Sequence, residues 1–419
     1  MGCQLGDIGS DHSNGEVDDI FGNWDSDSDE ESRQGHSSKS QNKFDLNSAT
    51  LNLSSEGGEM FELAAQGALD NLIKVLSEQS NSVNTQNSDG HTLLMIACDR
   101  GDLTMVKFLV SQDADLDKQD NFGNTALMCA CARGHASTVR YLMENGSKIT
   151  MRQREGKTAL MIASQLGHRE TCKLFTRKSN IYLRNKSVGT PVKSKPSSFD
   201  PSRAMNIDMR DFDGRTSLIL SIAQSHTIVA KILLSSGANA EIKDNRGWNA
   251  LIWAIVKRQK SVASICLQST RDIELGDNEG TTPMMYACRY GMKAIYEELL
   301  ANGSDIGVQN SRGDTCLHEV CKSRVTDKTM FIRDDLIKKG ASLEVYNKEG
   351  KSPLDLLPCI TEEEQIESKN EKNRLIKLAK HVTFFWMVYY QFFVPSNMGR
   401  RVRERGGSVV PNCGEVNCG

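Results

Sequence analysis

Cysteine and histidine are the residue types of this chain that first suggest metal chemistry. The sequence holds twelve cysteines, and His318 precedes Cys321 by three positions, a helical spacing that places two ligands on one face. Zinc needs about four ligands around a single ion, and no second pair with metal-binding spacing accompanies this one. We therefore predict no metal and no other cofactor.

Two short motifs resemble the end of a phosphate-binding P-loop. They are Gly156-Lys157-Thr158 and Gly350-Lys351-Ser352. A P-loop also needs a glycine five residues before the second glycine, so that backbone amides can surround a phosphate. Met151 and Val345 stand at those positions. We predict no nucleotide binding, and because no nucleophile or carboxylate pair departs from the pattern described next, we predict no enzymatic activity.

A repeated phrase organises residues 87–358. An acid or amide is followed by glycine, one variable residue, and then Thr-x-Leu-x-x-Ala, as in DNFGNTALMCAC at 120–131. The glycines of this phrase are Gly90, Gly123, Gly156, Gly214, Gly247, Gly280, Gly313 and Gly350. Their spacings are 33, 33, 58, 33, 33, 33 and 37 residues. The 58 is one repeat with a 25-residue insertion, and the 37 is one repeat with four extra residues.

A period of 33 with Gly-x-Thr-x-Leu resembles the ankyrin repeat over roughly residues 58–358. The resemblance implies an all-α repeat solenoid with β-turn fingers, in an array of about seven to eight repeats including caps. The residues support this architecture independently. The glycine suits a turn that needs positive φ, the threonine suits a helix N-cap, and the apolar and small residues that follow form one helix face.

Four cysteines, Cys98, Cys131, Cys288 and Cys321, occupy one repeat position, where the ankyrin family usually has alanine. Neighbouring copies of a position lie about 10 Å apart, as packed helices do, whereas a disulfide needs Cα atoms within about 7 Å. We predict small, buried, unpaired thiols. The resemblance likewise implies that His318 forms backbone hydrogen bonds rather than binding metal.

The repeat pattern and its interruptions divide the chain. Residues 1–57 are predicted to be an acidic disordered tail; residues 58–175 a cap plus three repeats; 176–206 a basic flexible insertion with seven bases and one acid; and 207–358 the remaining repeats. The insertion is expected to weaken the coupling between the two blocks of repeats. Residues 359–381 suit a charged, solvated helix, and 382–419 an aromatic-rich tail with a basic end.

Charge is distributed unevenly along the chain. The total net charge is −3, while residues 1–60 carry thirteen acids and three bases, so the rest of the chain is +7. This balance disfavours a general polyanion binder, and we predict that nucleic acid is not a partner. Ser26 and Ser28 each precede an acid by three residues, a spacing that makes them candidate phosphorylation sites for acidophilic kinases.

The run VTFFWMVYYQFFV at 382–394 has three interpretations: docking on a partner or on the array, anchoring at a membrane, or a chain end without its own fold. Thirteen residues span about 20 Å as a helix, less than a bilayer requires. Because the N-terminus lacks the basic start and apolar run of a secretory signal, we expect reduced thiols and a cytoplasmic, alternatively nuclear, location.

Ankyrin arrays share a fold and differ in their partners. The resemblance implies a non-enzymatic adaptor or scaffold that binds proteins on a concave face made of finger tips and inner helices. Alternatives are a membrane-tethered ankyrin protein of the germline type that carries a SAM domain, a substrate adaptor for a ubiquitin ligase or kinase, and a nucleic-acid-associated regulator. The 20-odd residues between Pro358 and the aromatic run are too few for a SAM domain.

The candidate partner-binding residues are those expected at the finger tips. The residue after each turn glycine is expected to project into solvent, and Trp248 is the large aromatic residue of this set, so we expect it to anchor a partner; alternatively, Trp248 packs on its neighbouring finger. The full set of candidates is His91, Phe122, Asn124, Lys157, Arg215, Arg246, Trp248, Thr281, Arg312 and Asp314.

Overall fold

The structure is a computed structural model that describes residues 58–78, 83–176, 206–323, 326–357 and 370–382. The acidic segment with Ser26 and Ser28, residues 177–205 of the insertion, and the aromatic run beyond residue 382 lie outside the described residues. What the sequence predicts for them stays a prediction.

The described residues form an all-α array of eight helix pairs, with a single isolated β-bridge between Gln86 and Thr92. The inner helices are α1 (Gly58–Gln66), α3 (Leu93–Arg100), α5 (Ala126–Arg133), α7 (Ala159–Gln165), α10 (Ser217–Ala223), α12 (Ala250–Val256), α14 (Pro283–Arg289) and α16 (Cys316–Lys322). The outer helices are α2 (Leu69–Glu78), α4 (Leu103–Ser111), α6 (Ala136–Glu144), α8 (Arg169–Thr176), α11 (Thr227–Ser235), α13 (Lys260–Ser269), α15 (Lys293–Ala301) and α17 (Asp327–Lys338).

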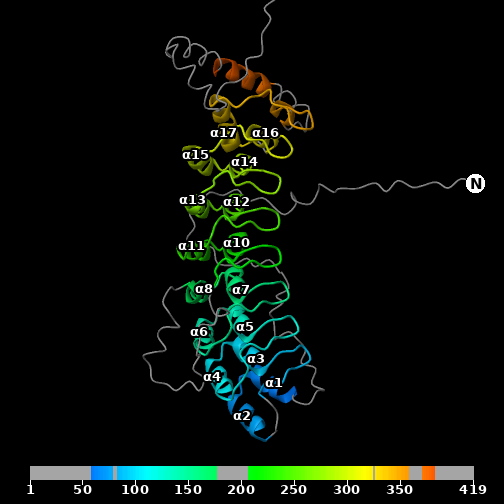
Figure 1. Ribbon diagram of the computed structural model, residues 1–419, viewed down its shortest axis with the longest axis vertical. Helices are drawn as coiled ribbons and strands as arrows, with labels where there is room; N and C mark the ends of the chain where they lie inside the picture. Colours follow the sequence, from blue (N-terminus) through cyan, green and yellow to red (C-terminus); the bar gives the residue numbers. More distant parts are fainter. Residues whose placement is uncertain (1–57, 79–82, 177–205, 324–325, 358–369, 383–419) are drawn as a thin grey trace, which may run out of the picture. The chain divides into compact units, whose positions relative to one another are not determined.

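Consecutive pairs stack with inner helix on inner helix and outer helix on outer helix. Figure 1 shows the two rows side by side, with the finger loops on the far side of the inner row. The core lies between the rows, where aliphatic, methionine, alanine and cysteine side chains are fully buried. Small residues such as Ala97 and Ala130 let neighbouring inner helices approach closely.

Each inner helix from α3 to α14 begins where the sequence predicts. The hydroxyl of Thr92 accepts the amide of Met95 at 3.2 Å, and Thr125, Thr158, Thr216 and Thr282 do the same in their own repeats. These N-caps satisfy amides that have no partner within the helix. At Asn249 the side-chain amide oxygen takes the place of the hydroxyl, bonding Ile252 at 2.9 Å.

The turn between the two helices of a pair has a glycine with positive φ in five of the described pairs, at Gly67, Gly101, Gly134, Gly167 and Gly291. Gly101, Gly134 and Gly167 have φ near +75°, a conformation that side chains with a Cβ adopt only at a cost. A Cβ on Gly134 would also lie 2.5 Å from the ring of His168 in the next repeat. Glycine is therefore required at position 134 for two reasons: the positive φ of its backbone, and the closeness of the His168 ring.

The two blocks of repeats pack directly on each other across the insertion. Helix α7 contacts α10, and α8 contacts α11, as in the other neighbouring pairs from α3–α4 to α16–α17. The amide of Phe212 donates to the carbonyl of Glu155 at 3.2 Å, and the guanidinium of Arg152 donates to the carbonyl of Arg210 at 2.7 Å. These contacts argue against the weakened coupling expected from the sequence.

The array ends in a 3₁₀ turn, η2 (Pro353–Leu356), followed after a gap in the described residues by a helical segment, 370–382. The sequence predicts a charged, solvated helix at 359–381; residues 370–382 are helical and exposed or partly exposed, except for Leu375, which is fully buried. Arg333 of α17, itself 3% exposed, pairs with Glu371, and Arg374 holds Asp334 at 2.6 Å. The segment 370–382 therefore packs on the last outer helix.

Candidate protein-binding surface

Seven fingers are closed by the side chain of an Asp or Asn at their first position. In the finger at 244–248, the Oδ1 of Asp244 accepts the amides of Arg246 and Trp248 at 3.0 and 2.9 Å. Its Oδ2 accepts the indole Nε1 of Trp253, on α12, at 2.9 Å. One carboxylate thus holds both the finger and an aromatic ring of the inner helix beneath it.

The next finger repeats this arrangement with tyrosine. The Oδ1 of Asp277 accepts the amides of Glu279 and Thr281, at 2.9 and 2.8 Å, and its Oδ2 accepts the hydroxyl of Tyr286 at 2.7 Å. Burial raises the pKa of Tyr286 well above its usual range, and the Asp277 carboxylate raises it further. Tyr286 is therefore a permanent hydrogen-bond donor at neutral pH.

Four rings meet between these two fingers and the inner helices. The ring of Trp248 lies edge-on to Trp253 at 5.1 Å and to Tyr286 at 5.6 Å, measured between centroids. Tyr286 stacks parallel to Tyr290 at 6.4 Å. We call Trp248, Trp253, Tyr286 and Tyr290 the aromatic cluster. Tyr286 is buried, and the other three are partly exposed.

Two arginines lie over the aromatic cluster. The guanidinium carbon of Arg246 is 5.9 Å from the ring centroid of Trp248, and that of Arg289 is 5.4 Å from Tyr286. Arg289 also donates to the buried carboxylate of Glu319, at 2.6 Å. The cluster therefore combines ring faces with positive charge, a combination frequent at protein interfaces.

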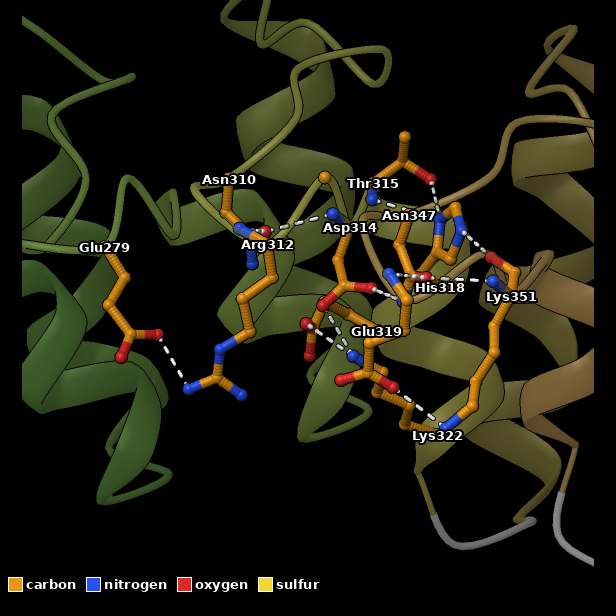
Figure 2. A network of polar contacts seen from close by, with 12 residues as sticks. Glu279, Asn310, Arg312, Asp314, Thr315, His318, Glu319, Lys322, Asn347 and Lys351 are labelled. Atoms are coloured by element: carbon orange, nitrogen blue, oxygen red, sulfur yellow. Dashed lines mark hydrogen bonds and ion pairs between the residues drawn. The ribbon is translucent and has the colours of Figure 1, made fainter. Parts of the chain in front are cut away.

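The following repeat carries a network of polar contacts around Asp314 (Figure 2). The Nζ of Lys322 donates to Asp314 at 2.5 Å, and the Nδ2 of Asn347 donates to the other oxygen of Asp314 at 2.9 Å. Burial by itself would raise the pKa of Asp314, but these two donors outweigh it and hold the pKa below its usual range. Lys322 also lies 3.9 Å from Glu319, which links this network to Arg289.

The structure corrects the expected exposure of the candidate residues. His91, Asn124, Lys157, Thr281 and Asp314 are buried, while Arg215 and Trp248 are intermediate. The reason is the finger geometry. Asn124, which follows the turn glycine, donates its backbone amide to Asp120 at 2.7 Å and its side-chain amide to the same carboxylate at 2.9 Å, so its side chain turns back onto its own finger.

The exposed finger residues are instead those before the glycine. Of the candidates, Phe122, Arg246 and Arg312 lie there and are exposed, and Phe212 is an exposed finger residue that the sequence reasoning missed. Trp253, Tyr286, Tyr290 and Arg289 were missed as well. A signal existed: Trp253 and Tyr286 hold the same repeat position, 33 residues apart, where other repeats have Ile96, Cys129 and Ile162.

Trp248 is not a free finger tip. Its ring packs on neighbouring residues, which is closer to the alternative interpretation given above. Trp248 packs on a ring of its own inner helix and on one of the next repeat. It is thus part of a surface that includes both finger and helix. We use the name finger face for the surface formed by the finger loops and the inner helices, on the side away from the outer helices (Figure 1).

The predicted thiols and His318 behave as structural residues. Cys98, Cys131, Cys288 and Cys321 are unpaired and at most 1% exposed, and burial raises the pKa of Cys321 to about 12. The Nδ1 of His318 bonds the backbone and hydroxyl of Thr315, at 3.1 and 2.8 Å, and its Nε2 lies 3.3 Å from the carbonyl of Lys351. The burial of these thiols and the hydrogen bonds of His318 to backbone groups agree with the sequence analysis.

The surroundings of the possible ligand-binding residues can be described for part of the chain. Within the described ranges, no group of three or more His, Cys, Asp and Glu side chains could hold a metal ion. In the P-loop-like triplet, the ammonium of Lys157 is paired with Glu155 at 2.8 Å and is largely buried. No helix in the described part of the chain is both long and apolar enough to cross a membrane.

The family comparison agrees with this geometry. A family model described as ankyrin repeats, three copies, matches residues 60–153, 112–187, 201–277 and 229–310, more than half of the chain. The chain belongs to the ankyrin repeat family. This membership confirms the all-α solenoid, and such repeats are generally non-catalytic protein-binding modules.

Among solved structures, the ankyrin repeat domain of Bcl-3, described as a unique member of the IkappaB protein family, is similar to this ankyrin array. The match covers 59% of this chain and 100% of the other, with 23% sequence identity and a TM-score of 0.46. No curated protein sequence matches the chain.

Proposed function

We propose that this ankyrin repeat protein is a non-enzymatic adaptor or scaffold that binds partner proteins on its finger face. The observation that carries the proposal is the aromatic cluster with Arg246 and Arg289 above it. Large aromatic and arginine side chains supply most of the binding free energy at many protein interfaces. Here they gather on two adjacent repeats, at the surface that ankyrin repeats generally use.

The proposal is tested by placing a photo-crosslinking amino acid at single positions of the full-length chain. Position Phe212 lies on the finger face, one finger before Arg246, and position Lys231, exposed on α11, lies on the outer row. We expect proteins of a cell extract to crosslink at position 212 and not at 231, with both variants melting like the parent chain. Crosslinking that arises only at position 231 would contradict the proposal.

The other roles considered from the sequence stay predictions. Membrane tethering depends on residues 383–394, and docking to a ubiquitin ligase or kinase depends on the acidic segment, both outside the described residues. Identity of the partner and cytoplasmic or nuclear location are also untested.

A further inference from the structure

The finger tips carry alternating charges in the second block of repeats. The residue immediately before the turn glycine is Asp213, Arg246, Glu279 and Arg312 in four successive fingers. Asp213 is paired with Arg215 of its own finger, and Glu279 is paired with Arg312 of the next, at 2.8 Å. The two carboxylates that flank Arg246 are therefore both engaged by other arginines.

The nearest remaining carboxylates are engaged too. Asp244 accepts two amides and the indole of Trp253, and Asp277 accepts two amides and the hydroxyl of Tyr286. Arg246 has no ion pair among the described residues. Its guanidinium is exposed and lies against the ring of Trp248 instead.

Arg289 differs from Arg246 in this respect. Its charge is already balanced by Glu319, which is 1% exposed. Of the two arginines that lie over the aromatic cluster, Arg246 is thus the one without an ion pair among the described residues. Trp253 and Tyr286 offer a partner ring surface, since their polar atoms are bonded internally.

We propose that this surface binds a segment of a partner protein in which a single carboxylate side chain lies next to an aromatic or large aliphatic side chain. The carboxylate pairs with the guanidinium of Arg246, a fork that matches carboxylate geometry. The apolar side chain covers Trp248 and Trp253 and excludes water from that ion pair, which strengthens it. The proposal rests on the finger face being the binding surface, and specifies the chemistry of its partner.

The test selects peptides from a random phage-displayed library on the full-length chain. We expect the enriched peptides to share Asp or Glu within two positions of an aromatic or large aliphatic residue. Affinity of the best peptide should fall about tenfold with Arg246→Ala, the loss of one charged interface contact of roughly 1.4 kcal/mol. Arg154→Ala is the matched control, because Arg154 is also an exposed finger arginine that lies over a ring, that of Phe122, and it should leave the affinity unchanged.

A charge exchange gives an independent readout. Replacing the carboxylate of the peptide by lysine should abolish binding to the parent chain and restore binding to the Arg246→Glu variant. Enriched peptides without an acid, or peptides equally sensitive to Arg246→Ala and Arg154→Ala, would overturn this inference. Such peptides, if they crosslink to a photo-reactive residue at position 212, would leave the finger face as the binding surface and refute only its acidic specificity.

Discussion

The Nε2 of His226 lies 3.0 Å from the carbonyl oxygen of Gln165, although 61 residues separate them. The same contact joins His135 to Asp99 and His168 to Ala132, each at 2.9 Å and 36 residues apart. The 25 extra residues leave the contact between the neighbouring repeats unchanged. Since a carbonyl only accepts, the ring nitrogen carries the proton in all three contacts.

Direct packing across the insertion predicts a single unfolding transition. Repeat arrays are coupled through neighbour interfaces, and the interface between α7–α8 and α10–α11 is built like the others. Urea unfolding followed by circular dichroism and by tryptophan fluorescence should give coincident midpoints. Two separated transitions would show that the insertion divides the array after all.

The contact between Gly134 and His168 predicts a mutational cycle. Gly134→Ala should destabilise the array more than Gly237→Ala, because both glycines have positive φ but a Cβ meets a ring only at Gly134. The φ cost alone is about 1 kcal/mol, so we expect ~2 kcal/mol or more for Gly134→Ala. Adding His168→Ala should recover part of the loss, as measured by urea unfolding. Equal effects of the two glycine variants would show that the ring has no role.

Buried histidines predict loss of stability in mild acid. Burial lowers the pKa of His91, His226 and His318 below the usual value, which is about 6.5. The unfolded chain therefore binds protons more readily than the folded chain as pH falls below about 6.5. The contribution of these histidines to the free energy of unfolding should be complete above about pH 6.5 and should decrease as the pH falls toward 5.

The variant His226→Gln isolates one of these histidines. Gln259 occupies the equivalent position one repeat later and donates to the carbonyl of Ile222 at 2.6 Å, so glutamine keeps the hydrogen bond without titrating. This variant should lose less stability between pH 7.5 and 5.5 than the parent chain. An unchanged pH slope would mean that His226 does not contribute.

The packing of segment 370–382 predicts that it stabilises the end of the array. Leu375→Asp places a carboxylate in a fully buried site, which costs about 2–4 kcal/mol locally. The melting temperature of the full chain should fall, whereas Lys377→Asp, at an exposed position of the same helix, should have little effect. Similar melting of both variants would show that the segment is not part of the folded array.

The burial of the described cysteines predicts how slowly they react with thiol reagents. Eight described cysteines are free and buried, and only an accessible thiolate reacts readily. Labelling with a thiol reagent, followed by mass spectrometry, should leave these eight unmodified until the chain unfolds.

A chelator should not shift the melting curve. A shift would indicate a metal site at the cysteines and His318.

The sequence by itself determined what depends on neighbours within one repeat. Turn glycines such as Gly123 and N-caps such as Thr125 act through hydrogen bonds between residues three to five positions apart in the chain. The spacing of these residues therefore predicts the finger, the start of the helix and the period of the repeat. The buried position of Cys131 follows from the same periodicity. Each of these is a local requirement that a linear pattern can express.

Only the tertiary structure decided which side chains share the finger face. Thr281 and Asp314 are buried, and Asp314 is bonded to Lys322 of α16, neither of which the motif reveals. Packing brings Trp248 against Tyr286 of the next repeat, and Arg333 against Glu371 of the segment 370–382. Such contacts depend on how successive parts of the array pack on one another, which the motif of a single repeat does not express.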